Sequence, residues 1–261
     1  MSSDQTPIAE RNIGIFESSR VTAWYADHGL DPAEKRLLLD WESDYAGKRV
    51  LDLGVGTGRT TAIVAPSASH YVGIDLSEPM LAEARIRFPT TEFRRMDIRD
   101  IASLPRRSLD YILASFAVMD VFEHEERARV IAAARRALRA DGLFVFSFHN
   151  LRWRDAGKPP QAPSSLNPLR WARDMRQYVI GRRNYLARAH LEKRGEVHAM
   201  LRDMAHQWRG VFYYTTPQAQ IAEVEALGFE ATAMIGADGR DMARDDIGLD
   251  DAMPYLRCRK L

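Results

Sequence analysis

The feature that most constrains the fold is the stretch RVLDLGVGTGR at residues 49–59, where an apolar run meets three alternating glycines. The apolar run is typical of a strand buried on both faces. Gly54, Gly56 and Gly58 allow positive φ and lack the Cβ atoms that would keep a ligand away from the main chain. The helix expected next directs its unpaired N–H groups to the same place. This order predicts a cofactor site.

The spacing of the glycines narrows the choice of cofactor. A dinucleotide-binding fingerprint reads G-x-G-x-x-G, whereas here Arg59 occupies the sixth position and the third glycine comes early, at Gly58. This spacing argues against NAD and FAD. A Rossmann-like domain that binds another nucleotide, or none, remains an alternative at this point.

Two acidic residues follow the next two predicted strands. Asp75 ends the apolar run at residues 71–75, where a carboxylate would accept hydrogen bonds from a ribose diol. Asp97 ends a third run at residues 91–98, where an acceptor suits an exocyclic amino group. We therefore expect both carboxylates at the same edge of a parallel sheet as the glycine loop.

The order VLDLGVGTG, VGIDLS and MDI resembles the class I S-adenosylmethionine (SAM)-dependent methyltransferases over about residues 48–150. The resemblance implies that the glycine loop holds the methionyl part of SAM, Asp75 the ribose and Asp97 the adenine. It also implies an α/β Rossmann-like fold with helices on both faces of a seven-stranded, mostly parallel sheet. The implied strand order is 3-2-1-4-5-7-6, with the last strand antiparallel.

The cofactor-binding residues expected on this basis come from the ends of the first four strands. They are Asp52, Gly54, Gly56, Gly58, Arg59, Asp75, Leu76, Met80, Asp97, Ile98, Ser115 and Phe116. Met80 would contact the adenine, or it would simply fill the core. The expected cofactor is SAM, with S-adenosylhomocysteine as product and no metal, since no H-x-x-x-H or clustered carboxylate pattern occurs.

Composition predicts a globular protein, and the sequence shows no targeting or membrane-spanning segment, so we expect the protein in the cytoplasm. Hydrophobic residues make up 46% and charged residues 28% of the 261 residues. Cys258 is the single cysteine, which excludes an intramolecular disulfide and a cysteine zinc site. The N-terminus lacks the apolar segment of a signal peptide, and no run of about 18 apolar residues occurs. The net charge of +1 predicts no attraction of the whole molecule to membranes or nucleic acid.

The chain divides into three parts by pattern. Residues 1–44 form a helical cover, with a helix beginning at the capping box of Asp31 and Glu34. Residues 45–150 and 211–261 form the core, in which residues 123–140 predict a helix that ends at Asp141 and Gly142. A strand is expected at residues 143–148. Residues 151–210 form an insertion, expected to be helical from residue 170 to 208.

The insertion is strongly basic. It holds 13 Lys and Arg residues against five Asp and Glu residues, a net charge of +8, while the rest of the chain carries −7. An insertion after the fifth strand lies at the open end of the sheet, so it would act as a lid that favours an acidic acceptor, a phosphorylated sugar or RNA. The alternatives are a solvated helix face and an oligomer contact, which leaves a homodimer open.

Candidate catalytic and substrate residues lie on the same side of the sheet. Asp120 follows the fourth strand and would face the substrate as base or cation stabiliser, or else cap a helix. His149 ends the fifth strand and would be a general base or a residue of the pocket floor. Tyr25, Tyr213 and Tyr214 are candidate substrate contacts, with core packing as the alternative. Residues 211–217 resemble the aromatic-aromatic-Thr-Pro segment of small-molecule methyltransferases.

The expected function is transfer of a methyl group from SAM to an oxygen of a small-molecule or sugar acceptor, in secondary-metabolite or polysaccharide biosynthesis. Small-molecule N-methylation is an alternative, although the Asn/Asp-Pro-Pro-Tyr motif for bases and glutamine is absent after strand four. An RNA methyltransferase that uses the basic insertion is another. A SAM-binding regulatory or partner subunit is the non-enzyme alternative.

Overall fold

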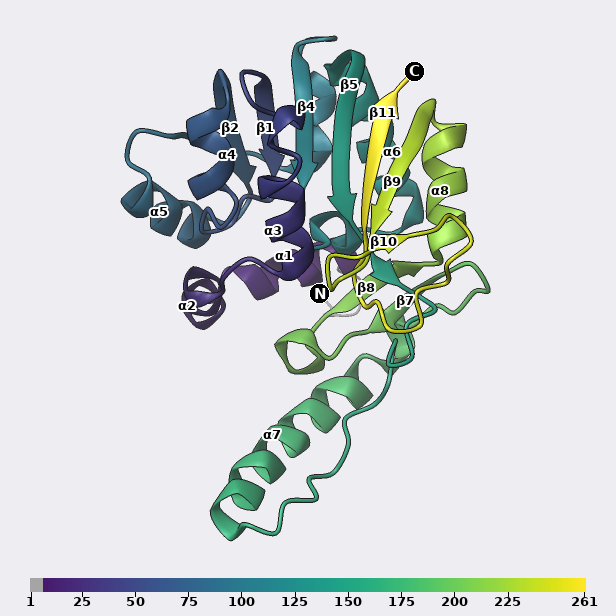
Figure 1. The fold of residues 1–261 in the computed structure, drawn as a ribbon. Helices are drawn as coiled ribbons and strands as arrows, with labels where there is room; N and C mark the ends of the chain where they lie inside the picture. Colours follow the sequence, from purple (N-terminus) through teal and green to yellow (C-terminus); the bar gives the residue numbers. More distant parts are fainter. Residues whose placement is uncertain (1–6) are drawn as a thin grey trace.

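A central eight-stranded sheet organises the computed structural model, which describes residues 7–261 (Figure 1). The sheet order is β10-β9-β11-β5-β4-β1-β2-β3. The strands are β1 (Arg49–Leu53), β2 (His70–Asp75), β3 (Glu92–Arg95), β4 (Leu109–Ala114), β5 (Leu138–Ser147), β9 (Phe229–Ile235), β10 (Asp241–Met242) and β11 (Tyr255–Lys260). The first five strands pair in parallel, and β11 is antiparallel to both β5 and β9.

This sheet confirms the expected fold class. Seven of its strands follow the predicted order, with β11 as the antiparallel last strand between β5 and β9. The two-residue strand β10 adds an eighth strand at the edge. The sequence did not predict β10, because a two-residue edge strand carries no alternation of apolar and polar residues.

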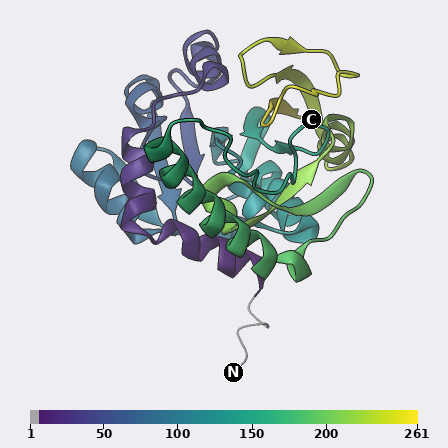
Figure 2. The ribbon, with the colours of Figure 1, turned by 90° about the horizontal axis from the view of Figure 1, so that it is seen from below.

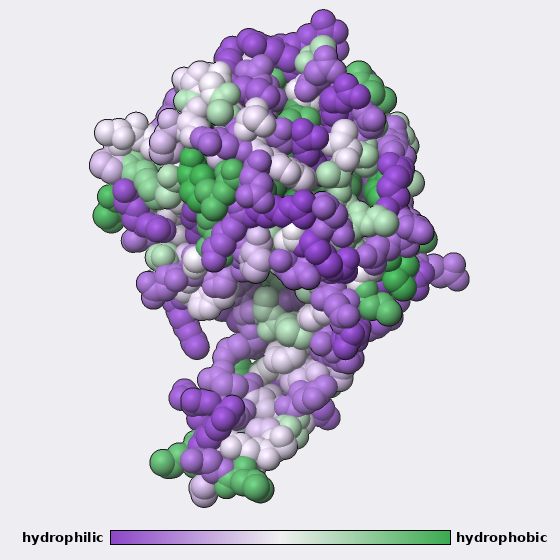
Figure 3. Space-filling model, in the orientation of Figure 1, coloured by the Kyte–Doolittle hydropathy of each residue, from purple (hydrophilic) through white to green (hydrophobic). Residues whose placement is uncertain are grey.

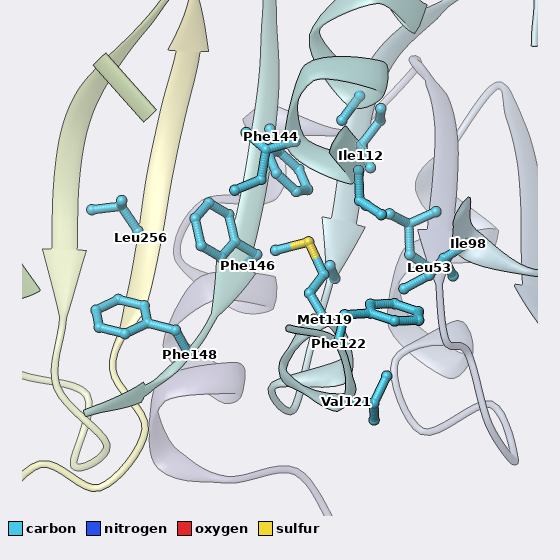
Figure 4. Packing of buried hydrophobic residues seen from close by; sticks show 14 of the residues in the cluster. Leu53, Ile98, Ile112, Met119, Val121, Phe122, Phe144, Phe146, Phe148 and Leu256 are labelled. Carbon is cyan, nitrogen blue, oxygen red and sulfur yellow. The ribbon is translucent and has the colours of Figure 1, made fainter. Parts of the chain in front are cut away.

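Helices cover both faces of the sheet, as expected for central strands such as β1 and β2, in which consecutive residues are buried. One face packs against α5 (Glu78–Arg87), α6 (His124–Ala137) and α8 (Pro217–Ala226). Figure 4 shows part of this cluster, in which Phe144, Phe146 and Ile112 pack beside Met119. The other face packs against α3 (Pro32–Leu39) and α4 (Thr61–Ser67) through residues such as Leu37 and Val64.

The described part of the N-terminal cover consists of α1 (Ile8–Phe16), α2 (Ser19–Asp27) and α3. Asn12 of α1 is fully buried, and its amide donates to the carbonyls of Val121 and Val211 and accepts from the Val211 N–H. Helix α1 is thereby fixed against two segments that lie far along the chain. The predicted capping box of α3 is confirmed, since the Asp31 N–H donates to Glu34 Oε2 at 2.9 Å.

The boundary between α6 and β5 differs from the prediction. Helix α6 ends at Ala137, and Leu138 already pairs with Leu109 of β4. Asp141 therefore lies inside β5, where it has φ of 60°. The sequence Ala-Leu-Arg-Ala is favourable in a helix, and only the pairing with β4 reveals that the strand has begun.

The insertion contains more than helices. Helix α7 (Pro168–Ala187) is followed by β7 (His198–Arg202), so the expected helix through residue 208 is wrong beyond α7. Strands β6 (His149–Asn150), β8 (Val211–Thr215) and β7 form a second sheet in the order β6-β8-β7. Residues 211–215 thus join this small sheet and do not return to the large one. Strand β6 pairs with β8 across the whole insertion, and such a pairing leaves no local signal in the sequence.

Helix α7 projects from the rest of the molecule in Figure 1, and in the view from below in Figure 2 it lies in front of the body. Within α7 only Gly181 is buried. Among residues 7–261, no helix has the length and apolar character needed to span a membrane.

Candidate active site

A cavity lies at the carboxyl ends of β1, β2, β4 and β5, where ligands bind in open α/β sheets. Eleven of the twelve predicted cofactor residues line it: Asp52, Gly54, Gly56, Arg59, Asp75, Leu76, Met80, Asp97, Ile98, Ser115 and Phe116. The exception is Gly58. Its φ is +82°, and a Cβ there would lie 2.7 Å from the Phe88 ring, so Gly58 allows packing against α5 and does not line the cavity.

Two side chains lie close to the glycine loop. Gly54 has φ of +65°, and a Cβ there would overlap Val118 Cγ2. The Gly56 N–H donates to Asp75 Oδ2 at 2.8 Å. The loop is therefore joined directly to the end of β2.

The carboxylate of Asp75 is held by two backbone amides. Gly56 donates to Oδ2, and the Ser77 N–H donates to Oδ1 at 2.8 Å. Burial raises the pKa of Asp75, and these amides oppose the rise. Each oxygen keeps a further lone pair, so the carboxylate can accept two more hydrogen bonds from neighbouring hydroxyl groups.

Asp97 lines the cavity but already has a cationic partner. Arg99 donates from Nε to Oδ1 at 3.1 Å and from Nη2 to Oδ2 at 2.6 Å. Burial acts to raise the pKa of Asp97, but the bonds from Arg99 outweigh it and the net shift is downward. Sequence reasoning identified Asp97 and missed Arg99, although it lies only two residues further on.

The carboxylate of Asp52 holds the segments around the glycine loop together. It is buried and accepts from the hydroxyls of Thr60, at 2.5 Å, and Tyr71, at 2.7 Å. Burial raises its pKa to about 6 despite these two bonds. The strand β1, the start of α4 and the strand β2 are joined at this one carboxylate.

Arg59 lines the cavity in contact with two other residues of the site. Its guanidinium pairs with Glu34 and lies 4.4 Å from the centre of the Phe116 ring. Glu34 also accepts from Ser115 Oγ at 2.5 Å, so the residue predicted only to cap α3 also positions the site. The buried Nε of Arg59 has no hydrogen-bond partner among the described residues. An anionic ligand group would satisfy it.

The backbone turns sharply where β4 ends. Phe116 and Ala117 have φ of 60° and 54°, a left-handed conformation that is strained for residues other than glycine. Side chains hold the turn: the Phe116 N–H donates to the Tyr255 hydroxyl at 3.2 Å, and the Ala117 N–H donates to Ser147 Oγ at 2.6 Å. This strain is located at the edge of the cavity.

His149 lines the cavity, whereas Asp120 lies behind it. Asp120 is fully buried and is not among the lining residues, so the expectation that it faces the substrate is wrong. Its Oδ2 is 3.0 Å from His149 Nδ1 and accepts from the His149 N–H at 2.7 Å. Its Oδ1 accepts from Arg127 Nε at 2.9 Å. His149 and the buried Arg127 thus take up both carboxylate oxygens.

The pKa of His149 shifts upward in this environment. Burial alone would lower it, but the hydrogen bond and the charge of Asp120 outweigh burial, and the charge of Asp203 acts in the same direction. A histidine with a raised pKa is a stronger base than a free imidazole. Sequence reasoning named both His149 and Asp120 but assigned the cavity position to both.

The second sheet and the segment η6 (Ala205–Trp208) supply Asp203, His206 and Phe212 to the cavity wall. Tyr213 and Tyr214, predicted as substrate contacts, do not line it. The Tyr213 hydroxyl lies 2.8 Å from His124 Nδ1, outside the cavity. The Tyr214 hydroxyl donates to Asp203, and its ring stacks behind His149 with centroids 4.9 Å apart.

Tyr25 of α2 lines the cavity, as predicted for a residue of the N-terminal cover. Its ring lies against Phe16, Phe116 and His206, which come from three separate segments. Burial raises the pKa of the Tyr25 hydroxyl. Tyr25 therefore joins the N-terminal cover to both the β4 turn and the insertion.

The Lys and Arg residues of the insertion lie outside the cavity. None of the 13 Lys and Arg residues between residues 151 and 210 lines the cavity, whereas Asp203 does. The expected role of the basic charge in selecting an acidic acceptor therefore finds no support in the lining. Within residues 7–261, no group of three or more His, Cys, Asp and Glu side chains could hold a metal ion.

The sheet order, the glycine loop and the acids at the ends of β2 and β3 define the class I methyltransferase fold. Comparison with known proteins agrees: residues 50–142 match the family model described as a methyltransferase domain, Methyltransf_25. Residues 50–142 thus match a methyltransferase domain, within a chain that has the class I methyltransferase fold.

Two curated relatives are named ubiquinone biosynthesis O-methyltransferase. The one from Hahella chejuensis is 32% identical over 145 residues, covering 52% of this chain and 59% of the relative. The one from Aromatoleum aromaticum is 30% identical over 131 residues, covering 47% and 53%. The chain therefore spans little more than half the length of these relatives.

Solved structures resemble a larger part of the chain. A putative SAM-dependent methyltransferase from Listeria monocytogenes has a TM-score of 0.59 and 22% identity, covering 88% of this chain and 98% of the other. Burkholderia thailandensis 1,6-didemethyltoxoflavin-N1-methyltransferase, solved with its acceptor and S-adenosylhomocysteine, has a TM-score of 0.58 and 16% identity, covering 100% and 93%. At these identities the likeness establishes the fold.

Proposed function

We propose that this protein transfers a methyl group from SAM to an oxygen of a small-molecule acceptor. The observation that carries the proposal is the position of His149, which lines the cavity with its Nδ1 against the buried carboxylate of Asp120. A general base at this position suits an acceptor whose nucleophile is a neutral hydroxyl group, because that group must lose a proton. The names of the two O-methyltransferase relatives support the same choice.

The cavity fits the cofactor at three points. The unpartnered Nε of Arg59 suits the methionyl carboxylate, and the free lone pairs of Asp75 suit the ribose diol. Met80 and Ile98 offer apolar surfaces to the adenine beside Asp97. When bound, SAM supplies a methyl carbon that its sulfonium makes electrophilic, with S-adenosylhomocysteine as the leaving product.

The residues of the chain align the acceptor and remove one proton from its hydroxyl group. Asp120 accepts from His149 Nδ1, which fixes the tautomer and leaves Nε2 as the nitrogen that takes the proton from the acceptor hydroxyl. Arg127 pairs with Asp120 and holds the carboxylate in place beside the imidazolium that forms. Alignment of the acceptor oxygen by the cavity walls supplies most of the remaining rate.

The walls near His149 favour a flat acceptor. Tyr25, Phe212 and His206 present rings there, and rings pack well against planar, largely apolar molecules. Asp203 adds one carboxylate, which would accept from a second hydroxyl or an amino group of the acceptor. This lining favours an aromatic hydroxyl over a sugar.

A small-molecule amine is the second candidate acceptor. The carboxylate of Asp203 would attract a protonated amine into the cavity, and the structurally similar toxoflavin enzyme is an N-methyltransferase by name. A SAM-binding regulatory subunit is less consistent with a cavity that places His149 and Asp203 beyond the cofactor residues. RNA is disfavoured because no cation of the insertion lines the cavity.

The test combines binding with label transfer. Calorimetric titration with SAM and with S-adenosylhomocysteine measures cofactor binding, and methyl-labelled SAM incubated with cell extract identifies the labelled product. Label in a small molecule that hot hydriodic acid releases as methyl iodide, as it does from an O-methyl group, supports the proposal. Binding without transfer to any fraction favours the regulatory subunit, and label in RNA overturns the small-molecule acceptor.

A further inference from the structure

Helix α7 offers a surface that the proposed reaction does not use. Twenty residues of α-helix extend about 30 Å, and the helix stands away from the large sheet (Figure 1). One face packs on the body: Gly181 lies against Trp208, and the Asn184 amide donates to the Gln207 carbonyl. The remaining faces have no partner element.

An apolar stripe runs along one of these exposed faces. Trp171, Met175, Val179 and Leu186 follow at spacings of four, four and seven, which places them on one side of a helix. Trp171, Val179 and Leu186 are 44%, 57% and 58% exposed. Globular proteins rarely leave such a stripe on a single helix without a partner.

The far end of the projection is apolar as well. Leu166 is 100% exposed and Leu169 is 85% exposed, just before and just inside the start of α7. In the space-filling view, hydrophobic side chains gather at this tip (Figure 3). A fully exposed leucine contributes nothing to the stability of this chain by itself, so the tip is suited to contact another apolar medium.

Arginines accompany the apolar side chains. Arg176 and Arg183 are exposed, lie beside the stripe and make no ion pair with an acidic side chain among residues 7–261, while Arg182 falls within the stripe. Helix α7 has five arginines and a single acid, Asp174. The rest of the chain outside the insertion has a net charge of −7. The positive charge is thus concentrated on the projection.

We infer that α7 and its preceding tip dock on an anionic lipid surface. Exposed Trp and Leu side chains would enter the headgroup region, and the arginines would pair with lipid phosphates beside them. The negative body would be repelled from the same surface, so docking would be oriented through α7. The net charge of +1 over the whole chain conceals this separation of charge.

Two other occupants fit the surface less well. A second copy of the chain, with two α7 helices packed together, would bring their arginines close to one another. RNA would pair with the arginines but would leave Leu166 and Leu169 without a role. Only a surface with both negative headgroups and an apolar interior matches both kinds of side chain.

Docking would also place lipid near the cavity. The segment η6 packs against α7, and its residues Ala205 and His206 line the cavity wall beyond His149. The inference about lipid does not depend on the chemistry of methyl transfer, because vesicle binding is measured without acceptor or cofactor.

The experiment is co-sedimentation of the full chain with two kinds of vesicle. We expect at least about tenfold stronger partitioning onto vesicles of phosphatidylcholine mixed with phosphatidylglycerol than onto phosphatidylcholine alone, weakening as salt is raised. The variant Arg176→Glu/Arg183→Glu should lose about tenfold or more of this binding. The variant Leu166→Ser/Leu169→Ser should also bind more weakly.

Matched variants on the body act as controls. Arg106→Glu/Arg129→Glu reverses the same charge at exposed sites, and Leu39→Ser/Ile86→Ser removes exposed apolar side chains there. Both should bind vesicles like the wild type. Equal partitioning onto the two vesicle types, or equal losses in body and helix variants, would overturn the inference. So would binding of poly(U) or dimerisation through α7 without vesicle binding.

Discussion

Asp120 Oδ2 accepts two hydrogen bonds from His149, one from its backbone N–H at 2.7 Å and one from Nδ1 at 3.0 Å. The carboxylate therefore fixes both the main chain and the ring of the same residue. Since Asp120 is itself paired with the buried Arg127, this arrangement is set before any ligand binds.

Replacing His149 tests the proposed base. His149→Gln should lower kcat by about 10²- to 10⁴-fold, because the acceptor loses the group that takes its proton. Binding of S-adenosylhomocysteine should stay within a few fold of wild type by calorimetry. His70→Gln, an exposed histidine at the start of β2, is the matched control. A kcat unchanged in His149→Gln would remove His149 from the mechanism.

The rate should depend on the protonation of His149. Its pKa is raised above the usual 6.5, so the imidazole is protonated at low pH and becomes a competent base only as pH rises through the raised value. Asp120→Asn removes the charge that causes the upward shift, so the rise in kcat should move to lower pH. NMR titration of His149 in both proteins checks this, and an unmoved pKa would contradict it.

The same shift has a consequence for stability. A raised pKa in the folded protein means that His149 contributes stability fully below pH 6.5 and loses that contribution as pH rises through the folded pKa. The difference in unfolding free energy between wild type and His149→Gln should therefore shrink toward alkaline pH. Urea denaturation at several pH values measures it, and a difference that grows with pH would reverse the sign proposed here.

Asp75 should dominate cofactor affinity. Asp75→Ala removes both acceptors for the ribose and leaves the N–H groups of Gly56 and Ser77 without their carboxylate. Affinity for S-adenosylhomocysteine should fall about 10- to 100-fold, as expected for lost hydrogen bonds to a charged group. Asp100→Ala, at an exposed position nearby in the chain, should bind normally. Unchanged affinity in Asp75→Ala would contradict the proposed cofactor site.

Gly54 should tolerate no side chain. In Gly54→Ala the new Cβ would meet Val118 Cγ2 and the backbone would keep a positive φ, so we expect a loss of about 2–5 kcal/mol in the free energy of unfolding. Gly47→Ala has a similar φ of +69° but no atom within 4 Å, so it should lose only about 1–2 kcal/mol. Equal losses in the two variants would show that crowding at Val118 is unimportant.

The sequence was informative wherever the signal is local. The capping box of Asp31 and Glu34 was confirmed. Capping depends on residues three apart, so it can be recognised without tertiary contacts. The second sheet was missed in part because β6 pairs with β8 from the other end of the insertion, which no local pattern reveals.

The acceptor side of the site was only partly predictable. Nothing near Asp203 or His206 in the sequence marks them as cavity residues, since β7 and η6 bring them to the wall only after the second sheet forms. Asp120 was found but misplaced, because the sequence does not reveal that Arg127, seven residues later, pairs with it.

The sequence by itself determined the class of fold and the residues at the carboxyl ends of the first strands that line the cavity. Apolar strands that end in glycines or in Asp75 and Asp97 specify these through local spacing alone, because parallel strands bring their carboxyl ends to one edge. Tertiary structure alone decided which side chains meet His149 and how charge is distributed in space. Those outcomes depend on contacts between distant segments, which the order of residues along the chain does not encode locally.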